Sequence, residues 1–276
     1  ANGVVIITTK KGGHHGAQVS IDAYDANQSK PKEYKVLNAE QFATLANQVA
    51  ANSNGTYQSF DAWANPASLH NVDWQNGLYR NGLTQDYNIA IRGGGDKVQT
   101  SSSIGYYGQK GIVQGAYFDR ITAATNVDYQ PLKWLKSATS IKYAHQDQNV
   151  PFGGSGSNNL LSLSALPPTM DSGNAKTTQI KDANGNYGFF NPIYVYVAKY
   201  SNPLFSIQTN RYQNLNNFFL ASSYLEATVF DGLKIKTNVG IDYSGYNGYY
   251  FSPEDDRLVN QYGAQAGATQ NAAYSQ

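Results

Sequence analysis

The sequence has no cysteine, a single methionine and few charged residues, which make up 14% of its 276 residues. The absence of cysteine excludes a disulfide scaffold, a thiolate zinc site and a cysteine nucleophile. Lys and Arg number 20 and Asp and Glu 19, so the net charge of +1 argues against a nucleic-acid-binding protein. Uninterrupted apolar runs are short, as in Val4-Val5-Ile6-Ile7, whereas a membrane-spanning helix needs about 20 mostly apolar residues.

Tyrosine and glycine are abundant instead, with 22 Tyr and 26 Gly. Much of the chain alternates between apolar and polar residues, most clearly over 233–244, where the odd positions are mainly apolar. These odd positions include Leu233, Ile235, Val239 and Ile241, and the polar even positions include Lys234, Lys236, Asn238 and Asp242. Because successive side chains of a strand point to opposite faces, this segment is predicted to be a strand with one apolar and one polar face.

The same alternation predicts seven strands after an opening β-branched segment. They cover residues 19–23, 87–92, 98–107, 120–129, 135–145, 212–229 and 233–244. Short turns at 93–96, 130–133 and 230–232 alternate with long segments at 29–85, 109–119, 150–211 and 252–276. Short periplasmic turns and long external loops are typical of outer-membrane barrels, so we predict an all-β fold that forms part of a large antiparallel transmembrane β-barrel.

Both ends of the sequence look internal to a longer protein. The chain opens inside a β-branched segment, and residues 263–276 fade into Gly, Ala, Gln and Asn. Seven strands cannot close a barrel, because open edges would leave backbone groups unpaired in lipid. In the first long loop, Asn38 and Gln41 have the residue types of a capping box. Phe42, Leu45, Ala46 and Val49 follow at helical spacing, so we expect one helix there, packed on the loop domain or bound to a partner.

No group of residues forms a convincing catalytic or metal-binding pattern. His14 and His15 are one adjacent pair in a Gly-rich turn, without the three or four converging ligands of a metal site. The segment 182–186 resembles a calcium loop only vaguely, because its glycine comes two positions early and no distal Glu follows. Calcium is therefore the one cofactor left open, no cofactor or metal is predicted, and the protein is not expected to be an enzyme.

Aromatic residues of the long loops are the candidates for substrate or partner binding. These are Trp63, Trp74, Phe189, Phe190, Tyr194 and Tyr196. Aromatic rings stack on sugars and pack on partner proteins, but loop domains also need small cores of their own. The sequence therefore leaves both roles open and favours the core role.

Several motifs together resemble the SusC/RagA-type TonB-dependent outer-membrane transporters of the Bacteroidota. Residues 1–12, ANGVVIITTKKG, resemble the end of the plug domain of that family. Matching motifs then follow in order, with Lys110 where the family pattern has Glu: Asp73-Trp74-Gln75, Gln85-Asp86-Tyr87-Asn88-Ile89, Gly93-Gly94-Gly95-Asp96-Lys97, Gln109-Lys110-Gly111-Ile112-Val113, Asn126-Val127-Asp128-Tyr129, Asn202-Pro203-Leu204 and Gly232-Leu233-Lys234. The individual motifs are short, but their common order spans nearly the whole chain.

The resemblance implies that residues 1–12 end a plug domain and that 13–276 form the N-terminal part of the barrel. It further implies a location in the outer membrane, a SusD-like surface lipoprotein as partner, TonB bound through an upstream segment, and a glycan or peptide as substrate. Apolar rows would then contact outer-membrane lipid, and Lys136, Lys142, Lys234, Lys236, Asn238 and Asp242 would face a hydrated lumen or the plug.

Two other functions are compatible with the same sequence. A SusC-like barrel could serve as a structural subunit of an outer-membrane secretion or assembly complex. A secreted carbohydrate-binding β protein is the third hypothesis, but rows of exposed Ile, Val and Leu argue against it.

Overall fold

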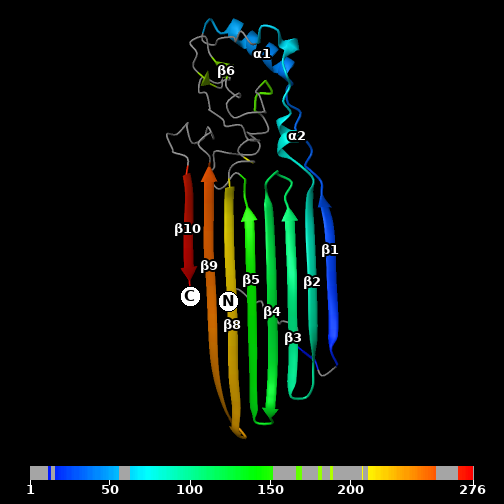
Figure 1. Ribbon diagram of the computed structural model, residues 1–276, viewed down its shortest axis with the longest axis vertical. Coiled ribbons are helices and arrows are strands. Elements are labelled where there is room, and N and C mark those ends of the chain that lie inside the picture. Colours follow the sequence, from blue (N-terminus) through cyan, green and yellow to red (C-terminus); the bar gives the residue numbers. More distant parts are fainter. Residues whose placement is uncertain are drawn as a thin grey trace.

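The computed structural model describes residues 12–13, 16–55, 63–151, 166–169, 180–181, 187–188, 207, 211–252 and 267–275. Eight strands form one antiparallel sheet in the order β1-β2-β3-β4-β5-β8-β9-β10. Figure 1 shows a tall sheet with helices and loops gathered at one end, which we call the loop end. The opposite end, with the short turns, is the turn end.

The sheet strands are long and pair with their neighbours in sequence order. Their bounds are β1 Gln18–Gln28, β2 Gly82–Gly94, β3 Val98–Lys110, β4 Tyr117–Leu132, β5 Leu135–Asn149, β8 Arg211–Phe230, β9 Leu233–Ser252 and β10 Gly267–Ser275. The two short strands β6 (Ile180–Lys181) and β7 (Tyr187–Gly188) pair separately. All seven predicted strands are confirmed, and each is longer than predicted.

The prediction of a loop over 252–276 is wrong for its last part. Residues 267–275 form β10 and pair with β9 from Gly267 opposite Ser252 to Ser275 opposite Ser244. The sequence of β10, GATQNAAYS, has little contrast between apolar and polar residues, so its alternation is weak. The loops predicted at 29–85 and 109–119 are also shorter, because β2 begins at Gly82 and β3 and β4 extend to Lys110 and from Tyr117.

The predicted alternation of connections is confirmed. Turns at 95–97, 133–134 and 231–232 join β2 to β3, β4 to β5 and β8 to β9 at the turn end (Figure 1). Gly232 has a φ of +94°, a left-handed conformation that favours glycine in a tight turn. The chain leaves β1, β3, β5 and β9 at the loop end.

The predicted helix is confirmed as α1, Ala39–Asn52. Asn38 accepts a 2.8 Å hydrogen bond from the Gln41 backbone N–H, and the Gln41 side chain accepts one of 3.1 Å from the Asn38 N–H. The predicted apolar stripe is confirmed in part, because Ala46 is buried and Phe42 packs against the core. Leu45 is exposed instead, and Ala39 and Ala43 complete the buried face. Small residues allow the helix to approach its neighbours closely in this loop domain.

Two small hydrophobic cores stabilise the loop domain. The first joins α1 to Trp63, with Phe42 and Leu69 packed against it. The second surrounds α2 (Trp74–Leu78) and consists of Val72, Trp74, Leu78, Leu166 and Ile207, with Tyr79 packed against it. A short 3₁₀ helix, Pro66–Ser68, lies between the two in sequence.

The sheet itself is a single layer in the described part of the chain. The side chains of Ile235, Val239 and Ile241 are 60%, 66% and 57% exposed, so no second sheet covers them here. Large apolar side chains exposed in rows need a non-aqueous neighbour. Within the described ranges, no helix combines the length and the apolar character needed to cross a membrane.

Candidate functional site

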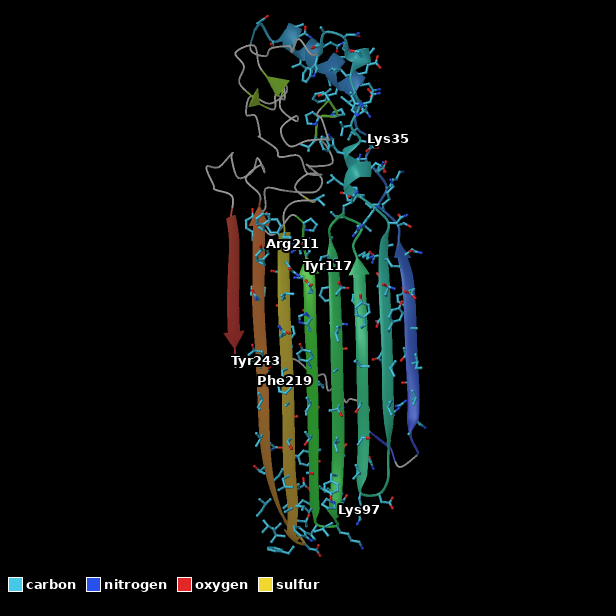
Figure 2. All side chains as sticks on the ribbon, viewed as in Figure 1. Lys35, Lys97, Tyr117, Arg211, Phe219 and Tyr243 are labelled. Carbon is cyan, nitrogen blue, oxygen red and sulfur yellow. The ribbon has the colours of Figure 1, made fainter. Side chains whose placement is uncertain are left out.

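The register of the sheet sorts the strand residues into two faces. Directly opposite residues of an antiparallel pair share a face, and successive residues of one strand alternate. One direct row crosses seven strands on what we call the apolar face: Ile21, Ile89, Ile104, Ala123, Tyr143, Phe219 and Tyr243. Figure 2 shows two of its members, Phe219 and Tyr243, at about mid-height of the sheet.

Most charged residues of β1 to β9 lie on the other face, the polar face. Following the register across β1 to β9 places these charged side chains there: Asp22, Asp86, Arg92, Arg120, Asp128, Lys136, Lys142, Glu226, Lys234, Lys236 and Asp242. This set includes all the charged residues that the sequence assigned to a hydrated face. Two of its cations have defined partners, because Lys234 pairs with Glu226 at 3.7 Å and Lys236 lies 4.0 Å over the Tyr224 ring.

The apolar face carries no Asp, Glu, Lys or Arg over most of its height in these same strands. Its charges begin only near the loop end, in a row that contains Asp25, Asp119 and Asp147. From Leu233 to Tyr243, ten residue steps of roughly 3.3 Å cover about 33 Å along β9. A strand tilt of about 40° reduces this height to about 25 Å, the height of the apolar band of a membrane barrel.

Tyrosine hydroxyls mark the upper edge of this charge-free band. Tyr87 donates a 2.7 Å hydrogen bond to Asp25 on β1, and Tyr106 donates one of 2.9 Å to Asp119 on β4. The rings of Tyr87 and Tyr106 stack with 6.3 Å between their centroids. Tyrosine with an apolar ring and a hydrogen-bonded hydroxyl suits the boundary between hydrocarbon and water.

A further Tyr–Asp pair lies at the same level. The Tyr117 hydroxyl donates a 3.2 Å hydrogen bond to Asp147 on β5, and the Gln213 amide donates to both oxygens of Asp147 at 2.9 and 3.0 Å. Tyr117 is labelled near the loop end of the sheet in Figure 2. The carboxylates on the apolar face are therefore hydrogen-bonded to neighbouring strands. We call these three aspartates and their tyrosine donors the Tyr–Asp row.

The polar face also carries aromatic side chains near the loop end, and the sequence reasoning missed them. Tyr107 and Phe118 meet edge to face at 5.9 Å, with the Arg120 guanidinium 5.5 Å from the Tyr107 ring. Tyr212 and Tyr250 lie with their ring centroids 4.5 Å apart. Even and odd positions of a strand lie on opposite faces, so Tyr107 lies on the other face from Tyr106. Sorting the aromatic residues of each strand in this way could have found them from the sequence.

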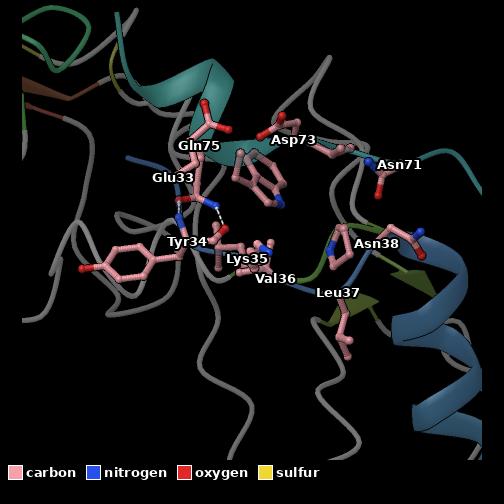
Figure 3. Close-up of a pocket in the computed structure, with 13 residues that line it drawn as sticks. Glu33, Tyr34, Lys35, Val36, Leu37, Asn38, Asn71, Asp73 and Gln75 are labelled. Carbon is pink, nitrogen blue, oxygen red and sulfur yellow. Dashed lines mark hydrogen bonds between the residues drawn. The ribbon is translucent and has the colours of Figure 1, made fainter. Parts of the chain in front are cut away.

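The loop domain contains a pocket of about 400 Å³ between the extended segment 33–38 and residues 71–75. Figure 3 shows the segment along one side and the Gln75 amide reaching it. Gln75 is buried and holds the segment by two hydrogen bonds, accepting from Tyr34 N at 2.8 Å and donating to Tyr34 O at 2.7 Å. Glu33, Lys35 and Asp73 add charges of both signs to the lining.

Two of the six aromatic residues predicted to bind substrate or partner lie in the described part of the chain. Trp63 and Trp74 are 1% and 2% exposed and belong to the two loop cores, which is the core role that the sequence left open. The Trp74 indole N–H also donates a 3.0 Å hydrogen bond to the Pro167 carbonyl. Phe189, Phe190, Tyr194 and Tyr196 lie outside the described residues, and a binding role for all six stays a prediction.

Residues outside the strands add two observations. Gly12, at the end of the predicted plug segment, packs against the backbone of β3, where an added Cβ would be 2.6 Å from Thr100 N and 2.7 Å from Thr100 O. Across the described part of the chain, no three His, Asp or Glu side chains gather as metal ligands do. Calcium binding at 182–186 remains untested, because that segment lies outside the described residues.

Comparisons with known proteins agree with this architecture. No protein-family model matches the chain. A TonB-dependent receptor of Formosa agariphila is 26% identical over 258 residues, which are 88% of this chain and 23% of that receptor. The TonB-dependent receptor SusC of Bacteroides thetaiotaomicron is 28% identical over 233 residues, covering 79% of this chain and 22% of SusC. The chain thus spans about a quarter of the length of these relatives.

Solved structures show the same fold. The RagAB peptide importer in its closed-closed state matches with a TM-score of 0.62 at 15% identity, over 90% of this chain and 30% of that chain. Its open-open state also gives a TM-score of 0.62, at 16% identity, over 88% and 29% of the two chains. These names are those of receptors and an importer, not of enzymes.

The sheet, with its band free of Asp, Glu, Lys and Arg and its loops at one end, has the fold of part of the wall of a β-barrel transporter, and its sequence is similar to those of TonB-dependent receptors. Within that class, the chain is similar to the SusC/RagA-type proteins, so the resemblance predicted from the sequence is confirmed.

Proposed function

We propose that the chain is the N-terminal wall segment of an importer in the outer membrane of a Bacteroidota-type bacterium. The observation that carries the proposal is the separation of charge between the two faces of the sheet. The apolar face contacts lipid up to the Tyr–Asp row, and the polar face lines a hydrated lumen that a plug domain occupies.

The proposed cargo is a glycan or a peptide, taken up together with a SusD-like lipoprotein at the cell surface. The polar face offers stacking surfaces and a cation near the loop end, at Tyr107, Phe118 and Arg120. Aromatic faces bind both sugar rings and apolar peptide side chains, so these residues suit either cargo. The loop domain lies beyond this end of the sheet, where a partner at the cell surface would meet it (Figure 1).

Energised import requires TonB, which would act on the plug of the full-length protein. The test is uptake of fluorescent oligosaccharides and peptides by cells that carry the full-length protein, with and without TonB. We expect accumulation of at least one cargo class that is lost without TonB. Uptake that continues unchanged without TonB contradicts energised import.

The partner is tested separately by purifying the full-length protein from its membrane with an affinity tag. A SusD-like lipoprotein recovered in equal amounts supports the import complex. A different partner in equal amounts, combined with no uptake of either cargo class, favours the scaffold function instead.

A further inference from the structure

A second hollow lies on the apolar face, where β2, β3 and β4 reach the loop end. Its volume is about 530 Å³, and none of the loop-core tryptophans takes part in it. Register places Leu83, Lys110 and Tyr117 in one direct row at this level. Gly108 lies one row lower, and the Tyr106 ring covers it so closely that a Cβ at position 108 would come within 2.9 Å of the ring's Cζ.

Two cationic side chains line this hollow. Arg80 is fixed in position, because its Nε donates to the Gly111 carbonyl at 3.1 Å and its Nη2 to the Ala116 carbonyl at 3.2 Å. A guanidinium has five N–H donors, and three of them take no part in these two hydrogen bonds. Lys110 is exposed at the end of β3 and makes no ion pair within the part of the chain that the structure describes.

The only carboxylate among the lining residues is Asp119, which already accepts the Tyr106 hydroxyl hydrogen bond at 2.9 Å. The Tyr117 hydroxyl is directed to Asp147. Among the lining residues, the two cations therefore outnumber the single carboxylate. The neighbouring Asp25 and Asp147 accept hydrogen bonds from Tyr87 and Tyr117. The guanidinium and ammonium donors of the lining favour phosphate oxygens.

The residues next to the hollow indicate which kind of phosphate compound fits it. Directly beneath it on the same face, Ile89, Ile104 and Ile121 are exposed and belong to the charge-free band. A ligand that fits both parts has a phosphorylated head and apolar chains. Free phosphate would use only the upper part.

We propose that the hollow at Arg80 and Lys110 binds the phosphorylated headgroup of an outer-leaflet glycolipid, whose acyl chains lie along the isoleucines below. This assignment rests on the proposed membrane placement of the apolar face. Arg80 supplies a positioned fork of donors, and Lys110 supplies a mobile charge at the rim.

The test measures binding to the full-length protein in detergent micelles, with phosphorylated lipid A, enzymatically dephosphorylated lipid A and inorganic phosphate as the three probes. The main variants are Lys110→Gln and Lys110→Glu. Lys97→Glu is the matched control, because Lys97 lies in the β2–β3 turn at the opposite end of the sheet (Figure 2). Arg80 is left intact, since its hydrogen bonds also hold the 111–116 loop.

We expect phosphorylated lipid A to bind about tenfold more weakly to Lys110→Glu, with a smaller loss in Lys110→Gln and none in Lys97→Glu. Equal binding of the dephosphorylated lipid, competition by inorganic phosphate at similar affinity, or unchanged binding to Lys110→Glu would each overturn the assignment. TonB-dependent uptake is measured on the same variants. If TonB-dependent uptake is retained and any of these results is found, only the lipid site is contradicted. The proposed import function is contradicted separately, by uptake into cells with the unaltered protein that does not depend on TonB.

Discussion

Ile89 of β2 and Ile104 of β3 lie directly opposite each other on the apolar face, and both are exposed in the sheet. The neighbouring residue Ser103 points to the polar face, where its partner is Ala90. Adjacent residues of one strand thus provide a matched pair for testing the two environments.

Lysine at position 104 should destabilise the barrel, whereas lysine at position 103 should be tolerated. A lysine on the lipid face costs about 2–4 kcal/mol at the bilayer midplane and less towards the interfaces, because its charge leaves water. Position 104 lies in the row of Tyr243, towards the upper end of the apolar band, so a cost of about 1–2 kcal/mol is expected. On a hydrated face the same side chain remains solvated. Unfolding of full-length Ile104→Lys and Ser103→Lys in urea, in lipid vesicles, measures the difference, and equal stability of the two variants would show that the faces are not distinct.

Removing the Tyr106 hydroxyl should weaken the edge of the apolar band. Tyr106→Phe loses the hydrogen bond to Asp119 and leaves that carboxylate without this donor, which should cost about 1–2 kcal/mol of unfolding free energy. Tyr107→Phe, on the polar face, loses only a long 3.4 Å contact to Gln109 and is the control. Equal losses in the same unfolding assay would argue against a special role for the Tyr–Asp row.

A side chain at position 12 should disturb the crossing between the chain and β3. Gly12→Ala would place a Cβ against the Thr100 backbone, and backbone cannot move aside as a flexible side chain does, so a destabilisation of about 1–3 kcal/mol is expected. Gly16→Ala has no atom within 4 Å of its added Cβ and should be neutral. Thermal unfolding of both full-length variants tests this, and an unaffected Gly12→Ala protein would mean that the crossing is not tight.

Trp63 and Trp74 should act through packing. Trp63→Ala empties the core beneath α1 and should cost about 3–5 kcal/mol locally, which amide hydrogen exchange in α1 reports directly. Trp63→Phe keeps most of the apolar volume and should preserve both the exchange protection and the uptake. If Trp63→Phe instead abolishes uptake with protection in α1 intact, the indole contacts cargo or partner after all.

Period-two alternation made most of the sheet predictable. In 233–244 apolar and polar residues alternate, because one face of β9 is apolar and the other carries Lys and Asp. The same reasoning failed for β10, Gly267–Ser275, because Gly, Ala, Thr, Gln, Asn and Ser leave no clear apolar and polar alternation in its sequence. β10 pairs with β9 through backbone hydrogen bonds, and these do not require particular side chains.

The loop domain shows where local patterns stop being informative. The capping box of Asn38 and Gln41 is a contact within four residues, and it was found from sequence. The hydrogen bond from Trp74 to Pro167 joins residues 93 positions apart, and no local pattern specifies it. The Tyr–Asp row is intermediate, because its members are visible as residue types but meet only through the register of β1 to β5.

The lipid contact of the apolar face is tested most directly by measuring the environment of successive side chains along β9. Spin labels placed one at a time from 237 to 242 in the full-length protein, in lipid bilayers, report access of molecular oxygen from lipid and of a water-soluble nickel complex. The proposed placement of the apolar face in lipid predicts oxygen access at the odd positions, including Val239 and Ile241, and nickel access at the even positions, including Asn238 and Asp242. Odd positions shielded from both reagents, or no alternation along the strand, would contradict it.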